Sequence, residues 1–147
     1  MCDKEYMDLA IEQAKLALLI DEVPVGAVIV KDGEVIGAGY NRRETDKSAL
    51  AHAEILAINE ACEKLDAWRL MGTTLYVTLE PCPMCAGAII NSRIERVVFG
   101  AFDKKAGSLC SVINLFDLPY NHKPELAAGV KERECAAMLT DFFRKLR

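Results

Sequence analysis

TTLYVTLEPCPMCAGAIINS, residues 73–92, is the stretch from which the fold of the chain can be worked out. Its first part is rich in β-branched and aromatic side chains, which favour a strand. Pro83 then suits the first turn of a helix, where its missing N–H leaves no hydrogen bond unmade. The stretch therefore predicts a strand over residues 73–79 that runs directly into a helix over residues 82–92, with two cysteines at the start of that helix.

Helical and strand patterns alternate on both sides of this stretch. Asp32-Gly33 is a strong hairpin signal, and Gly37 and Gly39 leave room for close approach by another group, such as a ligand. Asp3 is a candidate cap for the first helix. The remaining predicted elements are helices over residues 6–20, 51–65, 112–116 and 132–147 and strands over residues 25–30, 34–40, 96–100 and 125–130. This order predicts an α/β fold of three layers, α/β/α, around a central mixed sheet of five strands.

The length and composition are those of a globular protein. A chain of 147 residues most simply forms one domain, residues 1–147. No apolar run approaches the roughly 20 residues that a membrane span needs, and the charged amino terminus lacks the apolar stretch of a secretory signal. We therefore expect a cytoplasmic protein with no membrane segment, in which the six cysteines are reduced thiols rather than a disulfide framework.

The net charge of −4 at first argues against a nucleic-acid partner, because affinity for phosphate rests largely on Lys and Arg. Residues 1–80, however, hold 8 basic and 15 acidic side chains, a net −7, whereas residues 81–147 hold 10 basic and 7 acidic, a net +3. The half with the paired cysteines is thus the basic one, so either nucleic-acid contact or a solvated face of mixed charge is possible. Candidate phosphate contacts are Arg42, Arg43, Lys47, Arg93, Arg96, Lys104, Lys105, Lys123, Arg144, Lys145 and Arg147.

Three side chains have the chemistry and spacing of a catalytic zinc site. Cys82 and Cys85 are three residues apart, so on a helix they share a face and can bind one ion. A position at a helix amino terminus also lowers the pKa of a thiol, which favours the thiolate that binds metal. His52, at the start of the helix predicted over residues 51–65, is the third candidate ligand. Three protein ligands leave the fourth place of a zinc ion to water, as catalytic sites do.

Glu54 is the candidate proton carrier beside that ion. A carboxylate that does not bind the zinc can take a proton from water and pass it to a leaving amine. Two other interpretations fit parts of the pattern. A Cys-x-x-Cys pair alone also occurs as a redox pair, and a closed structural zinc site would take its fourth ligand from His122 or Cys110.

The motif His52-Ala53-Glu54 followed by Pro81-Cys82-Pro83-Met84-Cys85 resembles the signature of the zinc-dependent nucleobase deaminases. Further similarity to the bacterial tRNA adenosine deaminases covers almost the whole chain, through residues 22–27, 51–55, 75–89, 121–122, 134–137 and 141–143. The resemblance implies a cytidine deaminase-like fold and hydrolytic deamination of the wobble adenosine to inosine in a tRNA anticodon. It also implies a cytoplasmic homodimer with one zinc ion per subunit.

The resemblance also assigns roles to individual residues. By position, the zinc ligands and the proton carrier of the family fall on His52, Cys82, Cys85 and Glu54. Asn41, at the exit of the second predicted strand, resembles the family's contact to the target nucleoside. Asp103, in the loop after the strand over residues 96–100, resembles a contact to a neighbouring nucleotide. Both residue types also form turns, so a purely structural role is the alternative.

The chain departs from the family pattern at three places near the expected RNA surface. Ala49-Leu50 stands where the family commonly has Pro-Thr or Pro-Ser, Ser108–Ser111 lacks a usual glycine, and Phe102 stands where some members carry Arg. These departures and the acidic balance keep a deaminase of a free base or nucleoside, of guanine or cytosine type, as an alternative. A non-enzymatic zinc-binding module is the alternative of another class.

Overall fold

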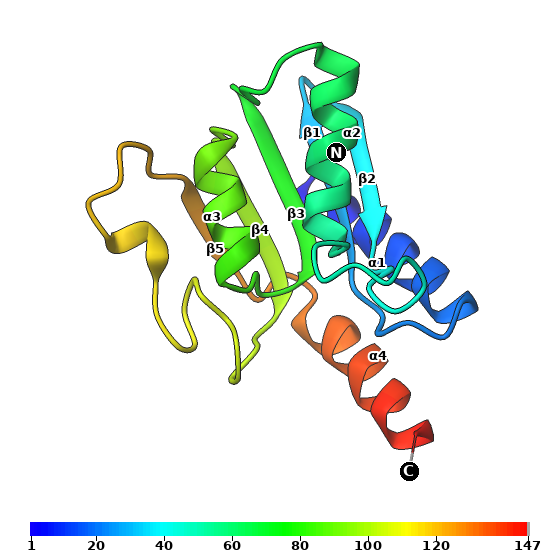
Figure 1. Cartoon of the computed structure of the whole chain (residues 1–147). Helices are drawn as coiled ribbons and strands as arrows, with labels where there is room; N and C mark the ends of the chain where they lie inside the picture. The colour runs from blue at the N-terminus through cyan, green and yellow to red at the C-terminus, as the bar shows by residue number, and fades with distance from the viewer. Residues whose placement is uncertain (147) are drawn as a thin grey trace.

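The computed structural model describes residues 1–146, which form a five-stranded sheet with helices on both faces (Figure 1). The elements are, in chain order, α1 (Asp3–Leu19), β1 (Gly26–Lys31), β2 (Glu34–Tyr40), α2 (Ala53–Leu65), β3 (Thr73–Leu79), α3 (Pro83–Asn91), β4 (Arg96–Ala101), the 3-10 turn η1 (Leu115–Asp117), β5 (Glu125–Ala128) and α4 (Glu132–Lys145).

The strands lie in the order β2-β1-β3-β4-β5. Strand β1 is antiparallel to both β2 and β3, while β3, β4 and β5 run parallel to one another. The carboxyl ends of β2, β3 and β4 therefore meet at one edge of the sheet, the position at which open α/β sheets bind ligands. The mixed five-stranded sheet and its three-layer α/β/α arrangement confirm the predicted fold class.

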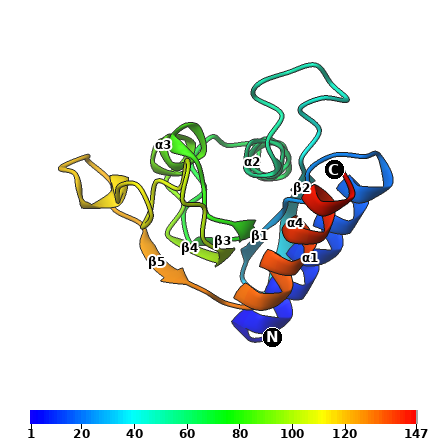
Figure 2. The same ribbon diagram turned by 90° about the horizontal axis from the view of Figure 1, so that it is seen from below.

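The helices cover the sheet in two pairs. Figure 2 shows α2 and α3 on one face and α1 and α4 on the other. Because side chains alternate along a strand, β3 supplies both cores: Leu75 and Val77 pack under α2 and α3, and Tyr76 packs under α1. Both ligand-bearing segments predicted from the sequence thus belong to the same face.

Glycines let two helices approach the sheet closely. A Cβ atom at Gly39 of β2 would lie 2.5 Å from the carbonyl oxygen of Ala53 in α2, and one at Gly37 would meet the carbonyl of Ala57. On the other face, a Cβ at Gly26 would overlap the backbone of α1. The room that was predicted at Gly37 and Gly39 is therefore filled by the backbone of α2 and not by a ligand.

Asp3 attaches the beginning of the chain to the middle of the sheet. Its carboxylate accepts two hydrogen bonds from the guanidinium of Arg96, at 2.8 and 2.7 Å, and one from the hydroxyl of Tyr76 at 2.8 Å. Asp3 was predicted to cap the first helix, but the residue at the cap position is Cys2, whose side chain makes no capping bond. A second contact between distant segments joins Lys131, just before α4, to Asp8 of α1.

The other predicted elements agree with the structure to within a few residues. The hairpin turn at Asp32-Gly33 has positive φ at both residues, 50° and 77°, as a two-residue turn of this kind requires. The short helix predicted over residues 112–116 is the 3-10 turn η1 instead. Residue 147, included in the last predicted helix, lies outside the described residues.

Among residues 1–146, no helix combines the length and the hydrophobicity that crossing a membrane requires.

Replacing Gly39 by Ala should destabilise the protein, because the new methyl group overlaps the backbone of α2. Overpacking of this kind costs about 1–3 kcal/mol, and each kcal/mol lowers the melting temperature of a domain of this size by about 2–4 °C. Gly87 in α3 is the matched control, because a Cβ there meets nothing within 4 Å. Thermal unfolding should show Gly39→Ala well below the wild type and Gly87→Ala at or above it; equal melting temperatures for the two variants would contradict the packing described.

Candidate metal centre and its pocket

The two segments with the predicted metal ligands are the starts of two helices at the ligand-binding edge of the sheet. His52 is the N-cap of α2 and has extended backbone angles, φ −81° and ψ 152°. Cys82 is the N-cap of α3 with φ −75° and ψ 175°, and Pro83 follows at the first helical position. Because an N-cap residue lies outside the helical spiral, His52 and Glu54 can face the same point although they are two residues apart.

The three donors lie within one coordination shell. His52 Nδ1 is 3.6 Å from the sulfur of Cys82 and 3.6 Å from that of Cys85, and the three ligand atoms all lie within 4.8 Å of one another. Bonds of about 2.0–2.1 Å to nitrogen and about 2.3 Å to sulfur, meeting at a tetrahedral angle, place those atoms about 3.5 Å apart. The group can therefore bind a metal ion with the bond lengths of zinc.

The thiols differ in acidity because they share a proton. A hydrogen bond from the Cys85 thiol lowers the pKa of Cys82 to about 4, helped by the contact with His52. The same hydrogen bond, followed by burial, raises the pKa of Cys85. The contact with the Cys82 sulfur in turn raises the pKa of His52. A metal ion would displace the shared proton and favour both thiolates.

Glu54 lies in the first turn of α2 beside the three donors and is only 4% exposed. Burial raises the pKa of its carboxyl group to about 7. A carboxyl group that changes protonation near neutral pH can both accept and release a proton. Within residues 1–146, Glu54 is not part of the group of potential metal ligands, which consists of His52, Cys82 and Cys85.

A cavity of about 530 Å³ opens at this edge of the sheet. His52, Glu54 and Cys82 line it, while Cys85 is fully buried. The other lining residues come from the loops after β2 and β4, from the α1–β1 connection, from the carboxyl end of β3, from the start of α2 and from α4: Val23, Val25, Asn41, Arg43, Ala53, Leu79, Glu80, Phe102, Asp103, Lys104, Lys105, Ala106, Leu139 and Phe143. The volume is within the range of small-molecule sites.

Asn41 and Asp103, the predicted substrate contacts, both line the cavity, and both also hold their own loops. Asn41 donates from Nδ2 to the carbonyl of Val23 at 3.2 Å and accepts from the N–H of Arg43 at 3.1 Å. Asp103 Oδ1 accepts from the backbone N–H groups of Lys105 and Ala106. Both residues therefore have the turn-forming role that the sequence offered as the alternative. This role is compatible with a contact to the substrate, because both residues also line the cavity.

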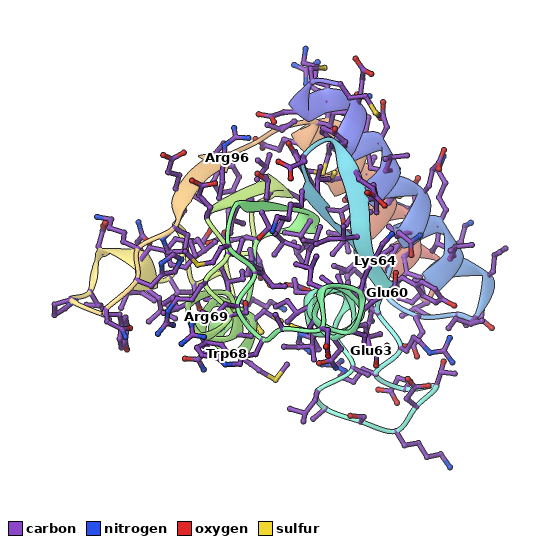
Figure 3. All side chains as sticks on the ribbon, turned by 90° about the horizontal axis from the view of Figure 1, so that it is seen from above. Glu60, Glu63, Lys64, Trp68, Arg69 and Arg96 are labelled. Carbon is purple, nitrogen blue, oxygen red and sulfur yellow. The ribbon has the colours of Figure 1, made fainter. Side chains whose placement is uncertain are left out.

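The candidate phosphate contacts differ in their surroundings, and only some of them lie at the cavity. Arg43, Lys104 and Lys105 line the cavity. Others have acidic partners elsewhere: Arg42 pairs with Asp46 and Lys123 with Asp117. Arg96 (labelled in Figure 3) pairs with Asp3 and is the first residue of β4, whereas the cavity lies beyond the last residue of that strand. Arg147 lies outside the described residues.

The residues considered as a fourth protein ligand lie apart from the metal group. His122 Nε2 is 2.7 Å from the carbonyl oxygen of Ile94, and Cys110 is exposed. Among residues 1–146, neither belongs to the set of side chains that could hold one ion together. All six cysteines are free thiols.

Sequence reasoning missed two acidic residues of the site, Glu80 and Glu22, both 2% exposed. Burial opposes ionisation of Glu80, but hydrogen bonds from Ser111 and from backbone N–H groups outweigh it and lower its pKa. The pKa of Glu22 is lowered in the same way, against burial, by hydrogen bonds from Thr45 and Glu44. A carboxylate at the end of an apolar strand, directly before Pro81, was the available signal for Glu80.

Comparison with known proteins gives the family of the chain. A model of the MafB19-like deaminases matches residues 1–147. The tRNA-specific adenosine deaminase of Bacillus subtilis is 55% identical over 146 residues, which cover 99% of this chain and 91% of that protein. The tRNA-specific adenosine deaminase of Aquifex aeolicus is 49% identical, covering 98% of this chain and 96% of that protein.

A solved structure leads to the same family. It comes from a study of A-to-I editing by tRNA:A34 deaminases at the wobble position of transfer RNA, and it superposes with a TM-score of 0.89 at 46% sequence identity. The superposition covers 92% of this chain and 99% of that one. By these matches the chain belongs to the MafB19-like deaminase family and to the family of the tRNA-specific adenosine deaminases.

Proposed function

We propose that this protein is a zinc-dependent hydrolytic deaminase that converts the wobble adenosine of a tRNA anticodon to inosine. The observation that carries the proposal is the convergence of three metal donors and the buried carboxyl group of Glu54 at one cavity. The names and high identity of the relatives support tRNA, rather than a free base, as the substrate. As a working unit, residues 1–147 would form one deaminase domain, supported by one sheet with a core on each face.

His52, Cys82 and Cys85 would hold one zinc ion per subunit, since their spacing fits the bond lengths of zinc. The chemistry that zinc supplies there is Lewis-acid activation of a water molecule, whose pKa falls towards about 7. A fourth place for that water is compatible with three protein ligands and with the open cavity on one side of the group.

Glu54 would move the protons of the reaction. The oxygen of water forms a bond to the adenine carbon that bears the amino group. The bond from that carbon to the amino nitrogen then breaks. The two protons of the water end on the ring nitrogen N1 and on the departing amine, which leaves as ammonia. A carboxyl group with a pKa near 7 beside the reacting atoms is suited to accept and deliver these protons in turn.

The cavity would take the target base after it has left the stack of the anticodon loop, which costs little in a single-stranded loop. Asn41 uses one donor and one acceptor within its loop, and its remaining N–H and lone pair are available to the nucleoside. Asp103 would contact a neighbouring nucleotide. Arg43, Lys104 and Lys105 at the cavity would neutralise phosphates.

We also propose that the chain forms a homodimer through the outer side of α3. Residues 68–71 bond to the end of α3, where the N–H of Leu70 donates to the carbonyl of Ser92. Trp68 (Figure 3) and Met71 of this segment are exposed. The segment just before η1 exposes Val112 and Ile113, and η1 itself packs on α3. Large apolar side chains left exposed on segments next to one helix suit a subunit interface.

Replacing Glu54 by Gln should abolish turnover while the metal stays bound, because the amide keeps the size of the side chain but cannot carry a proton. The expected loss is at least about 100-fold. The measurement is inosine formation in a tRNA anticodon stem-loop, with the zinc content of the same sample as control. A zinc-loaded variant that retains most of the activity would refute this role.

Removing zinc with a chelator should abolish activity and leave the fold intact, because the sheet is held by apolar cores on both faces. Added zinc should restore the activity. Circular dichroism, recorded on the same apo sample, separates this outcome from that of a structural zinc module. Unfolding of the chain on chelation would favour the structural module.

The protein should have a mass in solution of twice 16.2 kDa, measured by light scattering after gel filtration. Trp68→Asp should shift it towards the monomer, because a charge would be placed on the proposed interface. Leu19→Asp is the matched control: Leu19 is also exposed but belongs to α1, on the opposite face. A monomeric wild type, or equal effects of the two substitutions, would argue against the interface.

A further inference from the structure

The cavity is walled on two sides by loops without regular structure. The first wall comprises residues 41–50, after β2, and includes Asn41 and Arg43 at the cavity. The second wall comprises residues 102–111, after β4, and includes the stretch from residue 102 to residue 106 at the cavity. The backbone polar groups of such loops have no strand or helix partners and need other groups to fix them.

The second wall is built around the carboxylate of Glu80. This carboxylate accepts the backbone N–H groups of Asp103 (3.1 Å), Leu109 (3.2 Å), Cys110 (2.7 Å) and Ser111 (2.9 Å). It also accepts the hydroxyl of Ser111. One side chain thus binds both ends of the second wall. Asp103, the residue predicted to contact a neighbouring nucleotide, is at one end, and Ser111 is at the other.

The fit between this wall and Glu80 leaves no space. A Cβ atom at Gly107 would overlap the carboxyl group of Glu80. The backbone of the same segment is also bound to the strand end, because the N–H of Ser108 donates to the carbonyl of Pro81 at 2.9 Å. The wall is therefore attached to the two residues that immediately precede the metal donor Cys82.

The first wall is held by Glu22 in the same manner. Its carboxylate accepts the backbone N–H groups of Thr45 at 2.6 Å and Glu44 at 3.3 Å. The next residue along the chain, Val23, accepts the side-chain amide of Asn41 through its carbonyl. The α1–β1 connection thus fixes both the loop and the predicted nucleoside contact within it.

Neither carboxylate is used for anything else in the described part of the chain. Within residues 1–146, Glu22 and Glu80 take part in no ion pair and do not belong to the metal-binding group. A buried carboxylate is costly unless hydrogen bonds satisfy it. Here the compensating bonds all come from the two loops that form the walls of the cavity.

We propose that Glu80 and Glu22 are positioning residues that hold the two walls of the cavity in the shape that binds the RNA on either side of the target base. The inference rests on the proposed function, since the walls include the residues that would contact the nucleoside and its neighbours. The two carboxylates act through the loops and touch no reacting atom. Their contribution therefore belongs to substrate binding rather than to the chemical step.

The test is steady-state kinetics of the zinc-loaded Glu80→Gln and Glu22→Gln variants on an anticodon stem-loop. In each variant the side-chain NH₂ group would face backbone N–H donors, and the remaining oxygen carries no charge, so the hydrogen bonds that hold the walls are lost or weakened. We expect KM to rise about tenfold or more, since about 1.4 kcal/mol corresponds to a factor of ten. The turnover number should stay within about threefold, because loss of binding common to ground and transition states changes KM alone.

Hydrogen exchange supplies a readout that does not depend on activity. In Glu80→Gln, the backbone amides of Asp103, Leu109, Cys110 and Ser111 should exchange faster than in the wild type, while the amides of the first wall should not. Ser111→Ala removes one donor and should give a smaller rise in KM; it also keeps the test possible if Glu80→Gln does not fold.

Asp3→Asn is the matched control, because Asp3 is also a carboxylate bound by several donors but lies away from the cavity. It should lower the melting temperature and leave KM unchanged. A wild type that forms no inosine would overturn the proposed function. The positioning role alone would be overturned if the wild type is active and KM is unchanged in the folded, zinc-loaded variants. These variants are Glu22→Gln for the first wall and Glu80→Gln, or Ser111→Ala in its place, for the second.

Discussion

The close contact between α2 and β2 fixes the geometry of the site. The carbonyl of Ala53 lies so near Gly39 that no side chain fits between them. Ala53 stands between His52 and Glu54, so the imidazole and the carboxyl group are set by a backbone contact rather than by their own bonds. The cysteines reach the same point by another route, along β3, which pairs with β1 in the centre of the sheet. Two separate segments of the backbone thus bring His52 and the two cysteines to the same place.

The electrostatics at the starts of α2 and α3 explain why two of the three candidate metal ligands are cysteines. Both helices direct their amino termini, and hence the positive ends of their dipoles, at the site. A cation placed there would be repelled unless anionic groups accompany it. Two thiolates would neutralise a divalent ion, while burial of Glu54 opposes ionisation of its carboxyl group and raises its pKa to about 7. Three basic side chains, Arg43, Lys104 and Lys105, line the same cavity, so an acidic protein has a local group of positive charges there.

The sequence was sufficient for the elements and for the three candidate metal ligands that the structure brings together, but not for the walls of the cavity. Strand β3 and the start of α3 followed from residue types at adjacent positions, and the donors followed from spacing. The position of Glu80 before Pro81 was a signal, but the role of Glu80 and Glu22 could not be predicted, because their partners are backbone N–H groups of loops more than 20 positions away. Those loops have no periodicity to interpret. The prediction that Asp3 caps the first helix was wrong for a similar reason. Its carboxylate binds the guanidinium of Arg96, which is far away in the sequence.

The bond between Asp3 and Arg96 spans 93 positions of the chain. A ribosome adds about 5–20 residues per second, so α1 exists for on the order of ten seconds before its partner on β4 has been made. Its contact with Lys131 spans 123 positions and comes later still. The apolar face of α1 can pack on β1 much earlier, since Val28 and Val30 follow it closely in the chain. The polar bonds of α1 to β4 and to the start of α4 are therefore the last of its contacts to form, and they close the fold rather than begin it.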